Sequence, residues 1–251
     1  MKDPATFTDF ERRYPPDRFG EEASDHARVW KVYRDRATER DESRVEGWNK
    51  TLDILLIFAG LFSAVSTAFI IEAYKLLQPD YAEYTVKLLL LSLQNQGSQI
   101  PSDTLGSVNP LGFTPTSMAR WTNGLWFTSL ALSLIVALLS ILAKQWLEEY
   151  NTRMNLHVAN AHRWSWRHAV FGRGLRVWGL GTFISTLPAL LHISLFSFFA
   201  GLILFLVDLD SFIAFILCSM TAVIVVFYVA VTLLPIWYGD CPTATPLLRK
   251  A

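Results

Sequence analysis

Residues 54–71 read ILLIFAGLFSAVSTAFII, a run of 18 residues without a charged side chain that lies between Asp53 and Glu72. As an α-helix, a run of this length extends over about 27 Å, close to the thickness of a bilayer's hydrocarbon core. The flanking charges would lie where headgroups and water can solvate them. We therefore interpret this stretch as the first span of a protein that crosses a membrane several times.

A stripe of small residues runs along this predicted first span. Gly60, Ala64 and Ala68 recur at every fourth position, and Ser63 belongs to the neighbouring stripe. Small side chains let two helices approach closely inside a membrane, where van der Waals packing holds them together. We therefore predict that Gly60, Ala64 and Ala68 face another helix, that of the second or the fourth span.

Three further apolar stretches are long enough to cross a bilayer. Apolar residues make up 52% of the 251 residues and charged residues only 18%, too few charges for an ordinary soluble domain. The predicted fold class is therefore all-α, an integral membrane four-helix bundle with amphipathic helices at the interface. Its spans are predicted at 52–73, 121–143, 187–207 and 211–237, in a membrane domain at 24–248, with a loosely ordered tail at 1–23 and a short tail at 238–251.

Several residues indicate where helices begin. Ser24 or Asp25 can cap a helix that leads to the first span. Asp80, followed by Glu83, resembles a capping box that opens a short interfacial helix. Pro188 suits the first turn of a helix, so the third span is predicted to start one residue before it.

The charged segment before the first span carries Trp30, Tyr33 and Ala37 at helical spacing. Two interpretations stay open for it: an amphipathic helix that lies on the membrane surface, and a solvated helix that simply joins the span. Beyond the second span the helical pattern continues, and Glu149 and Arg153 are spaced for an ion pair one turn apart.

Lysine and arginine are distributed unevenly around the four predicted spans. The segment before the first span contains eleven, the first loop three, the loop at 144–186 six, the turn at 208–210 none and the tail two. Because cytosolic loops carry an excess of these residues, we predict that both termini and the 144–186 loop face the cytosol. The N-terminus lacks the apolar stretch of a cleavable signal peptide, so the first span is expected to direct insertion. Which membrane receives the protein is not indicated.

Residues suited to catalysis or metal binding are scattered. His157, His162 and His168 are separated by steps of five and six residues, which place them on different faces of a helix. The sequence has no dinucleotide-binding glycine motif, no G-x-S-x-G and no disulfide framework, so we predict no catalytic residue, no cofactor, no metal and no enzymatic activity. His192 lies inside the third span and is a candidate intramembrane polar residue. We favour for it a hydrogen bond to a neighbouring helix or to interfacial water.

Basic and aromatic residues alternate between the second and third spans. Arg163, Arg167, Arg173 and Arg176 are candidates for contact with anionic lipid headgroups, and the equally weighted alternative is that they only set the topology. Nucleic acid is not expected as a partner, because the topology rule already explains this patch. Cys241, just beyond the fourth span, is a palmitoylation candidate, with an unmodified thiol favoured.

A set of motifs resembles a known family. They are Trp30 and Tyr33, Trp48 with Leu52 and Asp53, FAGLFSAVSTAFIIEAYKLLQPD at 58–80, LWFTSLALSL at 125–134, KQW at 144–146, LPALLHISLFSFFAGLILFL at 187–206 and DCPTATPL at 240–247. Together they are similar to uncharacterised proteins of mushroom-type (basidiomycete) fungi, a family known only as a domain of unknown function. The resemblance covers about residues 28–248 and implies a multi-pass membrane protein. It brings no activity, cofactor or catalytic residue.

The function that these patterns favour is a membrane-anchored interaction or scaffold module that acts through its cytosolic surface. Its expected partners are the lipid bilayer and, as open alternatives, cytosolic proteins, anionic headgroups or a second copy in a homo-oligomer. The alternative function is an oligomeric channel or transporter. That alternative needs charges or broken helices along a path through the membrane, and the predicted spans offer only His192.

Overall fold

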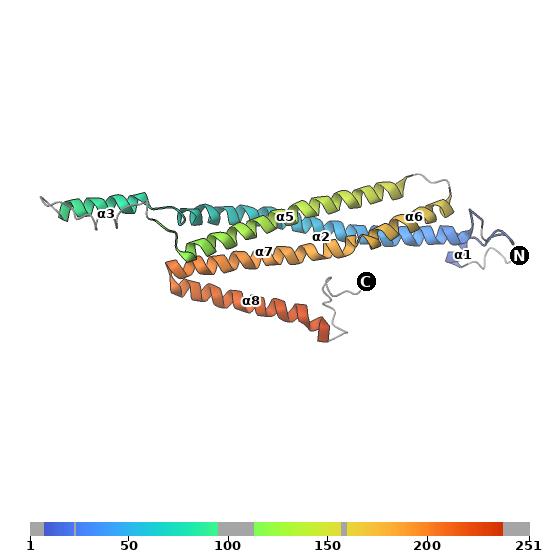
Figure 1. The fold of residues 1–251 in the computed structure, drawn as a ribbon. Coiled ribbons are helices and arrows are strands. Elements are labelled where there is room, and N and C mark those ends of the chain that lie inside the picture. The colour runs from blue at the N-terminus through green and yellow to red at the C-terminus, as the bar shows by residue number, and fades with distance from the viewer. Residues whose placement is uncertain (1–7, 23, 95–112, 157–159, 238–251) are drawn as a thin grey trace. The chain divides into compact units, whose positions relative to one another are not determined.

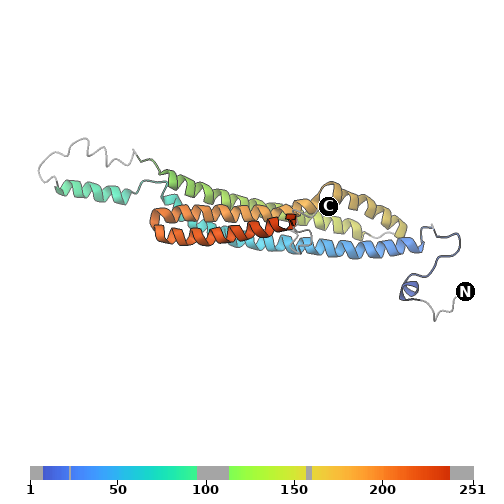
Figure 2. The same cartoon turned by 90° about the horizontal axis from the view of Figure 1, so that it is seen from below.

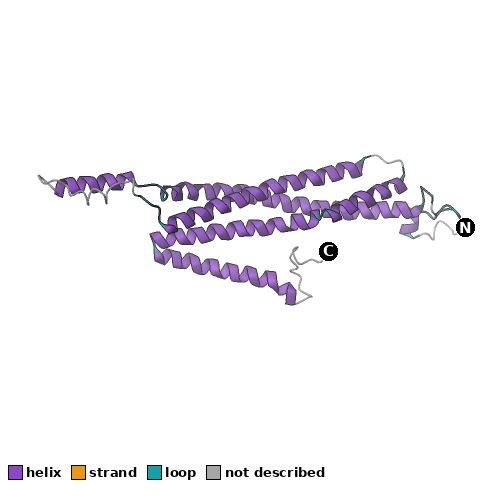
Figure 3. Cartoon of the chain, viewed as in Figure 1, coloured by secondary structure: helices purple, strands orange, loops and turns teal. Residues whose placement is uncertain are grey.

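A computed structural model of the chain describes residues 8–22, 24–94, 113–156 and 160–237. All regular secondary structure in these ranges is helical, as Figure 3 shows. Four helical segments of the described chain are long and apolar enough to cross a membrane. The prediction of an all-α fold with four helices of spanning length is therefore confirmed.

The helices are labelled in Figure 1, and their contacts divide the chain into two compact units. The helices are α1 (Asp9–Arg13), α2 (Arg28–Lys75), α3 (Tyr81–Gln94), α5 (Ser117–Asn155), α6 (Ala161–Val177), α7 (Leu180–Leu209) and α8 (Ser211–Trp237). Unit 1 comprises Met1–Phe58 and Val136–Pro188, and unit 2 comprises Ala59–Ile135 and Ala189–Ala251. Helices α2, α5 and α7 contribute residues to both units.

The first predicted span belongs to a much longer helix. α2 contains 48 residues, which corresponds to about 72 Å of helix and is more than twice the thickness of a hydrocarbon core. The charged segment therefore continues into the apolar segment without a break in the helix. Ala37 is buried, whereas Tyr33 is 42% exposed, so only a narrow face of this segment is covered.

The residues before α2 are more ordered than predicted. Helix α1 opens with a capping box in which Thr8 Oγ1 accepts a hydrogen bond from the backbone N–H of Glu11. Tyr14 is buried, and its hydroxyl donates to Asp35 of α2 at 2.8 Å. The stretch 8–22 is therefore attached to α2, which corrects the prediction of a loose tail. The predicted tail at 238–251, with Cys241, lies outside the described residues.

The start of α2 also differs from the prediction. α2 begins at Arg28, whose backbone N–H donates to the carboxylate of Asp17 at 2.8 Å. Asp17, rather than Ser24 or Asp25, therefore supplies the acceptor for this unpaired amide. Asp25 instead pairs with His162 of α6 at 2.8 Å. The carboxylate of Asp25 is therefore used for a contact with α6 and not as a cap of α2.

Two helix ends match the predictions. Asp80 Oδ1 accepts from the backbone N–H groups of Ala82 and Glu83 at 2.9 and 3.2 Å, so Asp80 caps α3 as expected, whereas the Glu83 side chain pairs with Lys87 and not with the cap. None of the described side chains of α3 is buried. α5 extends beyond the predicted second span, and its last turns contain the expected ion pair between Glu149 and Arg153.

Pro188 lies in the interior of α7 and not in its first turn, which corrects the prediction. α7 begins at Leu180, directly after Gly179, whose φ of +61° is the left-handed conformation that follows many helix ends. Because proline has no N–H, the carbonyl of Ile184 loses its usual helical donor. After α7, Asp210 Oδ1 accepts from the backbone N–H of Phe212 at 2.8 Å, and α8 has the bounds predicted for the fourth span.

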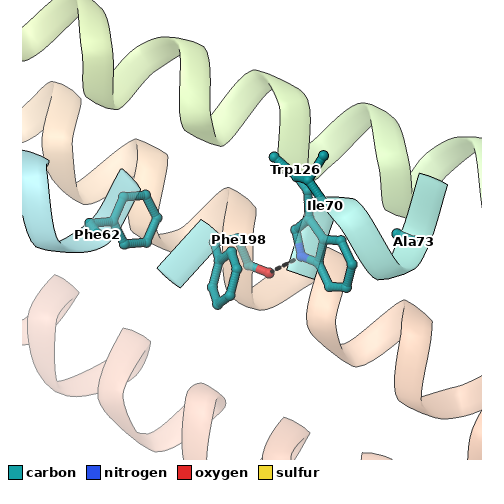
Figure 4. Packing of buried hydrophobic residues seen from close by; sticks show 5 residues of the cluster. All are labelled: Phe62, Ile70, Ala73, Trp126 and Phe198. Carbon is teal, nitrogen blue, oxygen red and sulfur yellow. Dashed lines mark hydrogen bonds between the residues drawn. The ribbon is translucent and has the colours of Figure 1, made fainter. Parts of the chain in front are cut away.

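The core of unit 2 is an aromatic cluster between α2, α5 and α7 (Figure 4). Its buried members are Phe62, Ile70, Ala73, Trp126 and Phe198. Trp126 is fully buried, and its indole N–H donates to the carbonyl oxygen of Phe198 at 3.1 Å. The relevant parts of the three helices lie side by side in both perpendicular views (Figures 1 and 2). Unit 2 is therefore organised around one tryptophan of α5.

A series of polar side chains along α5 connects it to both neighbouring helices in unit 2. Every acceptor is a backbone carbonyl oxygen. The donors and acceptors are Asn123 to Ala73 at 2.9 Å, Trp126 to Phe198 at 3.1 Å, Ser129 to Ser194 at 2.7 Å and Ser133 to Ala59 at 3.2 Å. Hydrogen bonds of this kind hold helices together where apolar burial gives no driving force.

Helix α8 contributes little to this core. Among its described side chains, Ala214 is the buried one. Tyr228 contacts His192 and Phe196 of α7. Large apolar side chains such as Phe212 are 72% exposed. Such a surface is unfavourable in water and is suited to contact with lipid.

Candidate functional site

A hydrogen-bonded network centred on Asp41 joins three helices of unit 1. Tyr150 of α5 donates its hydroxyl to Asp41 Oδ2 at 2.6 Å, and His168 Nε2 of α6 lies 2.9 Å from the same oxygen. The other ring nitrogen of His168 lies 2.8 Å from the hydroxyl of Tyr33. Trp164 stacks on the His168 ring, with an interplanar angle of 7°. The network fixes α6 and α5 against the charged part of α2.

Burial favours the neutral form of Tyr150 in this network. The side chains of His168 and Asp41 are only 16% and 19% exposed. Burial, and then the hydrogen bond to Asp41, raise the pKa of Tyr150 above its ordinary value. The phenol is therefore neutral and acts as a donor at physiological pH. When Nε2–H of His168 donates to Asp41, its Nδ1 accepts from Tyr33, so both ring nitrogens are used.

A hollow of about 290 Å³ lies beside this network, between α2 and α6. We call it the arginine pocket, after the five arginines that line it. They are Arg36, Arg40 and Arg44 of α2 and Arg173 and Arg176 of α6. Asp41 is the carboxylate in the lining, and its Oδ2 already accepts from two donors. The pocket is therefore strongly basic.

A second hollow of about 530 Å³ has the opposite character. Its lining includes Glu42, Glu46 and Asp53 of α2. Glu46 pairs with Lys50 at 2.7 Å, and this hydrogen bond holds the pKa of the Glu46 carboxyl below its ordinary value. Asp53 forms an ion pair with Lys144 of α5. Within this second hollow Glu46 and Asp53 therefore already have basic partners.

The four arginines predicted to contact headgroups are in three different situations. Arg173 and Arg176 line the arginine pocket. Arg163 is exposed on α6. Arg167 donates to the carbonyl oxygens of Arg153 and Leu156 at 2.9 and 3.0 Å, at the C-terminal end of α5. Arg167 therefore caps α5, a structural role that the sequence did not indicate.

The predicted histidine residues do not gather. His162 pairs with Asp25, whose pKa is lowered by this hydrogen bond, and His168 pairs with Asp41. His157 lies outside the described residues. Within the described ranges no three potential metal ligands of the His, Cys, Asp and Glu types cluster.

His192 lies on α7 in unit 2 and is half-buried. Its Nδ1 lies 3.3 Å from the hydroxyl of Tyr228 of α8, and the two ring centroids are 5.0 Å apart. The expected hydrogen bond to a neighbouring helix is present. His192 is therefore one of the few polar links between α7 and α8.

The predicted packing stripe of α2 does not face another helix within the described residues, which corrects the prediction. Gly60, Ala64 and Ala68 are exposed, and a Cβ added to Gly60 would meet no atom within 4 Å. The cause is helical geometry: Gly60 is two residues, about 200°, from Phe62, whose side chain is in the core. Ser63, on the neighbouring stripe, is half-buried, and its Oγ lies 3.2 Å from that of Ser133.

The close helix approach occurs at Gly201 of α7 instead. A Cβ added there would lie 2.7 Å from Cδ1 and Nε1 of Trp126, closer than real side chains come. A glycine is therefore required where α7 crosses the tryptophan of α5. No signal in the sequence marked this contact, because Gly201 is a lone glycine in an apolar run. For the arginine pocket a signal was present, because Arg36, Arg40 and Arg44 follow one another at i, i+4 spacing.

The comparisons with known proteins give one result. Residues 30–208 match the sequence profile of a family described as a family of unknown function (DUF6535). A comparison with curated proteins and a comparison with solved structures gave no match. The match includes the whole of α5 and α6 and the residues of the arginine pocket. The motif at 240–247 lies beyond it.

Proposed function

Since the chain belongs to the DUF6535 family of unknown function, we propose its function from its own structure: it is a multi-pass membrane protein in which unit 1 is a cytosolic interaction module. The proposal includes the topology expected from the lysine and arginine distribution, with both termini in the cytosol. A role as a scaffold for cytosolic partners is part of the same proposal.

The observation that carries this proposal is the division of polar and apolar surface between the units. The described surface of α8 is almost wholly apolar and exposed, which suits lipid. Unit 1 instead has two hollows lined by charged side chains and a hydrogen-bonded network that joins α2, α5 and α6 beside them. A charged surface continuous with apolar helices is what a membrane-bound interaction module needs.

An ion pair supports the predicted level of the membrane. Asp53 directly precedes the first apolar run, and Lys144 directly follows the second. Their side chains form a salt bridge between α2 and α5. Two antiparallel spans that leave the bilayer at the same level would bring these charges together at its surface. The pairing therefore favours one boundary for both spans.

Glycosylation mapping tests the topology. Acceptor sites engineered into residues 97–115 should be glycosylated, whereas Asn49 and sites placed at 150–170 should not. Asn49 already belongs to a sequon with Lys50 and Thr51, so it serves as an internal control. Glycosylation of Asn49 would show that unit 1 is outside the cytosol and would refute the proposal.

An ion-flux assay separates this proposal from the channel alternative. His192 is engaged with Tyr228 instead of standing unpartnered along a path. Liposomes that contain the purified protein should therefore show no ion flux above that of empty liposomes. Reproducible single-channel currents that disappear in His192→Ala would favour the channel.

A further inference from the structure

The arginine pocket concentrates positive charge in a small volume. Three of its arginines follow one another at every fourth position of α2, and two more come from the facing side of α6. From this arrangement we infer that the pocket binds a compact ligand with two or more phosphate groups. The inference concerns the ligand of unit 1, so it deepens the proposed interaction function.

The arginines of the pocket are largely unpaired within the protein. Among the described residues, the guanidinium groups of Arg40, Arg173 and Arg176 form no ion pair and no hydrogen bond, whereas that of Arg36 has only a distant and highly exposed partner, Glu39, at 3.7 Å. Arg44 lies over the ring of Trp48. Like charges held together without counter-charges repel one another, and a bound anion relieves that repulsion.

The single carboxylate in the lining, Asp41, offsets one of the five arginine charges and leaves the pocket basic. Asp41 Oδ2 accepts hydrogen bonds from Tyr150 and His168, which both come from the supporting network. The network holds α6 against α2 and so keeps the arginines of the two helices around one space. The site is therefore assembled before any ligand arrives, which lowers the cost of binding.

The chemistry of guanidinium selects phosphate. Each guanidinium can form two parallel hydrogen bonds to phosphate oxygens, and several of them together match more than one doubly charged group. A volume of about 290 Å³ lies at the low end of ligand pockets, which excludes large ligands. Extended nucleic acid is also a poor match, because the lining arginines of α2 lie within eight residues of one another, about 12 Å of helix.

The ligand can be soluble or the headgroup of a lipid. Arg44 precedes Ile54 by ten residues, about 15 Å of helix. If the first span starts at Ile54, the pocket lies beyond a headgroup layer of roughly 5–8 Å. A soluble ligand would reach it freely, whereas a lipid would need a headgroup that projects from the surface. This location rests on the proposed function, but the phosphate chemistry does not.

The experiment uses the full chain purified in a neutral detergent or in nanodiscs. Pyrophosphate and inositol 1,4,5-trisphosphate are the soluble probes, and inorganic phosphate is the single-phosphate comparison. In the lipid arm, nanodiscs of phosphatidylcholine contain either phosphatidylinositol 4,5-bisphosphate or phosphatidylserine at equal total charge. Binding is measured by calorimetry and by the increase in the unfolding midpoint that a ligand of the folded state produces.

Three variants connect binding to the pocket. Arg40→Gln and Arg173→Gln each remove one unpaired guanidinium, from α2 and α6 respectively, and should weaken binding at least tenfold. Arg163→Gln removes the same charge from an exposed position on α6 outside the pocket lining and should change the affinity less than twofold. Since Arg40 and Arg173 have no partner to lose, both variants should fold normally without ligand, which the unfolding midpoint checks.

Each outcome has a definite meaning. Binding of the soluble probes, lost in Arg40→Gln and Arg173→Gln, supports the inference and identifies a soluble ligand. Binding only to phosphoinositide nanodiscs, with the same loss, supports it with a lipid as the source. No binding of any multiply phosphorylated probe overturns it, as does an equal loss in Arg163→Gln, which would indicate non-specific attraction. Because detergent-solubilised protein is used in one arm, this result is independent of the topology test.

Discussion

Replacement of Gly201 by alanine tests the packing of α7 against α5. The added Cβ would lie 2.7 Å from Cδ1 and Nε1 of Trp126, whereas ordinary contact begins at 3.4 Å. The helix and the indole must therefore separate by about 0.7 Å, the difference between these distances. The hydrogen bond from Trp126 to the Phe198 carbonyl, now 3.1 Å, would lengthen towards about 3.8 Å and be lost.

The expected cost follows from three terms. Overpacking of a well-filled core costs about 1–3 kcal/mol. Loss of an interhelical hydrogen bond in a membrane protein costs about 0.6 kcal/mol on average. Alanine is better than glycine in a helix by up to about 1 kcal/mol, which offsets part of the loss. We therefore expect Gly201→Ala to lower the free energy of unfolding by about 1–3 kcal/mol.

The assay is unfolding of the purified chain in mild-detergent micelles by a denaturing detergent, followed by circular dichroism. Gly60→Ala is the matched control, because nothing lies within 4 Å of its new Cβ, and it should be neutral or stabilising by up to about 1 kcal/mol. In a Trp126→Leu background the cost of Gly201→Ala should largely disappear. Equal stability of Gly201→Ala and Gly60→Ala would refute the close approach.

Three further predictions concern polar groups. Burial raises the pKa of Tyr150 in the folded protein, so as the pH rises through about 10 the phenol ionises first in the unfolded chain and the free energy of unfolding falls. This alkaline decline should be shallower in Tyr150→Phe, which unfolding measured at about pH 8 to 11 would show. Ser129 and Ser194 each donate to the other's backbone carbonyl at 2.7 Å, so alanine at either position should lower the free energy of unfolding by about 0.6–1.7 kcal/mol. Because each bond needs only one of the two side chains, the two losses should be nearly additive in the double variant, and no loss in either single variant would argue against the pair. The double variant Asp53→Lys with Lys144→Asp exchanges the two charges and should restore the stability lost in either single variant. The gain in the free energy of unfolding should be less than about 1 kcal/mol, because both side chains are partly exposed. A double variant no more stable than the single variants would contradict the pairing.

The sequence predicted the helical fold and the four apolar segments of spanning length well, because apolar run length and local capping are properties of neighbouring residues. The bounds of α8 were predicted from Asp210 and the apolar run that follows it, and both signals are local. The packing face of α2 was predicted incorrectly. A stripe of small residues shows where a helix can approach, but the large residues Phe62 and Ile70 decide which side enters the core.

The candidate site could be predicted only in part. The arginine series of α2 and the basic patch of α6 are both visible in the sequence, yet nothing in it shows that they face one space. Their meeting depends on the register of two helices, which is set by the contact between Asp41 and His168, 127 residues apart. Pro188 was misplaced for a related reason, because the helix start is decided by Gly179 at the end of α6.

The donors of α5 have a consequence for how this family can vary. Asn123, Trp126, Ser129 and Ser133 all donate to carbonyl oxygens of the main chain. Any amino acid at the accepting position has that oxygen. The accepting residues of α2 and α7 can therefore be replaced without loss of the hydrogen bond, as long as the helix and its distance from α5 are kept. Evolutionary constraint should therefore fall on one side of each contact. Paired substitutions, the usual record of contacting residues in related sequences, should be scarce along these helix interfaces even though the helices are firmly joined.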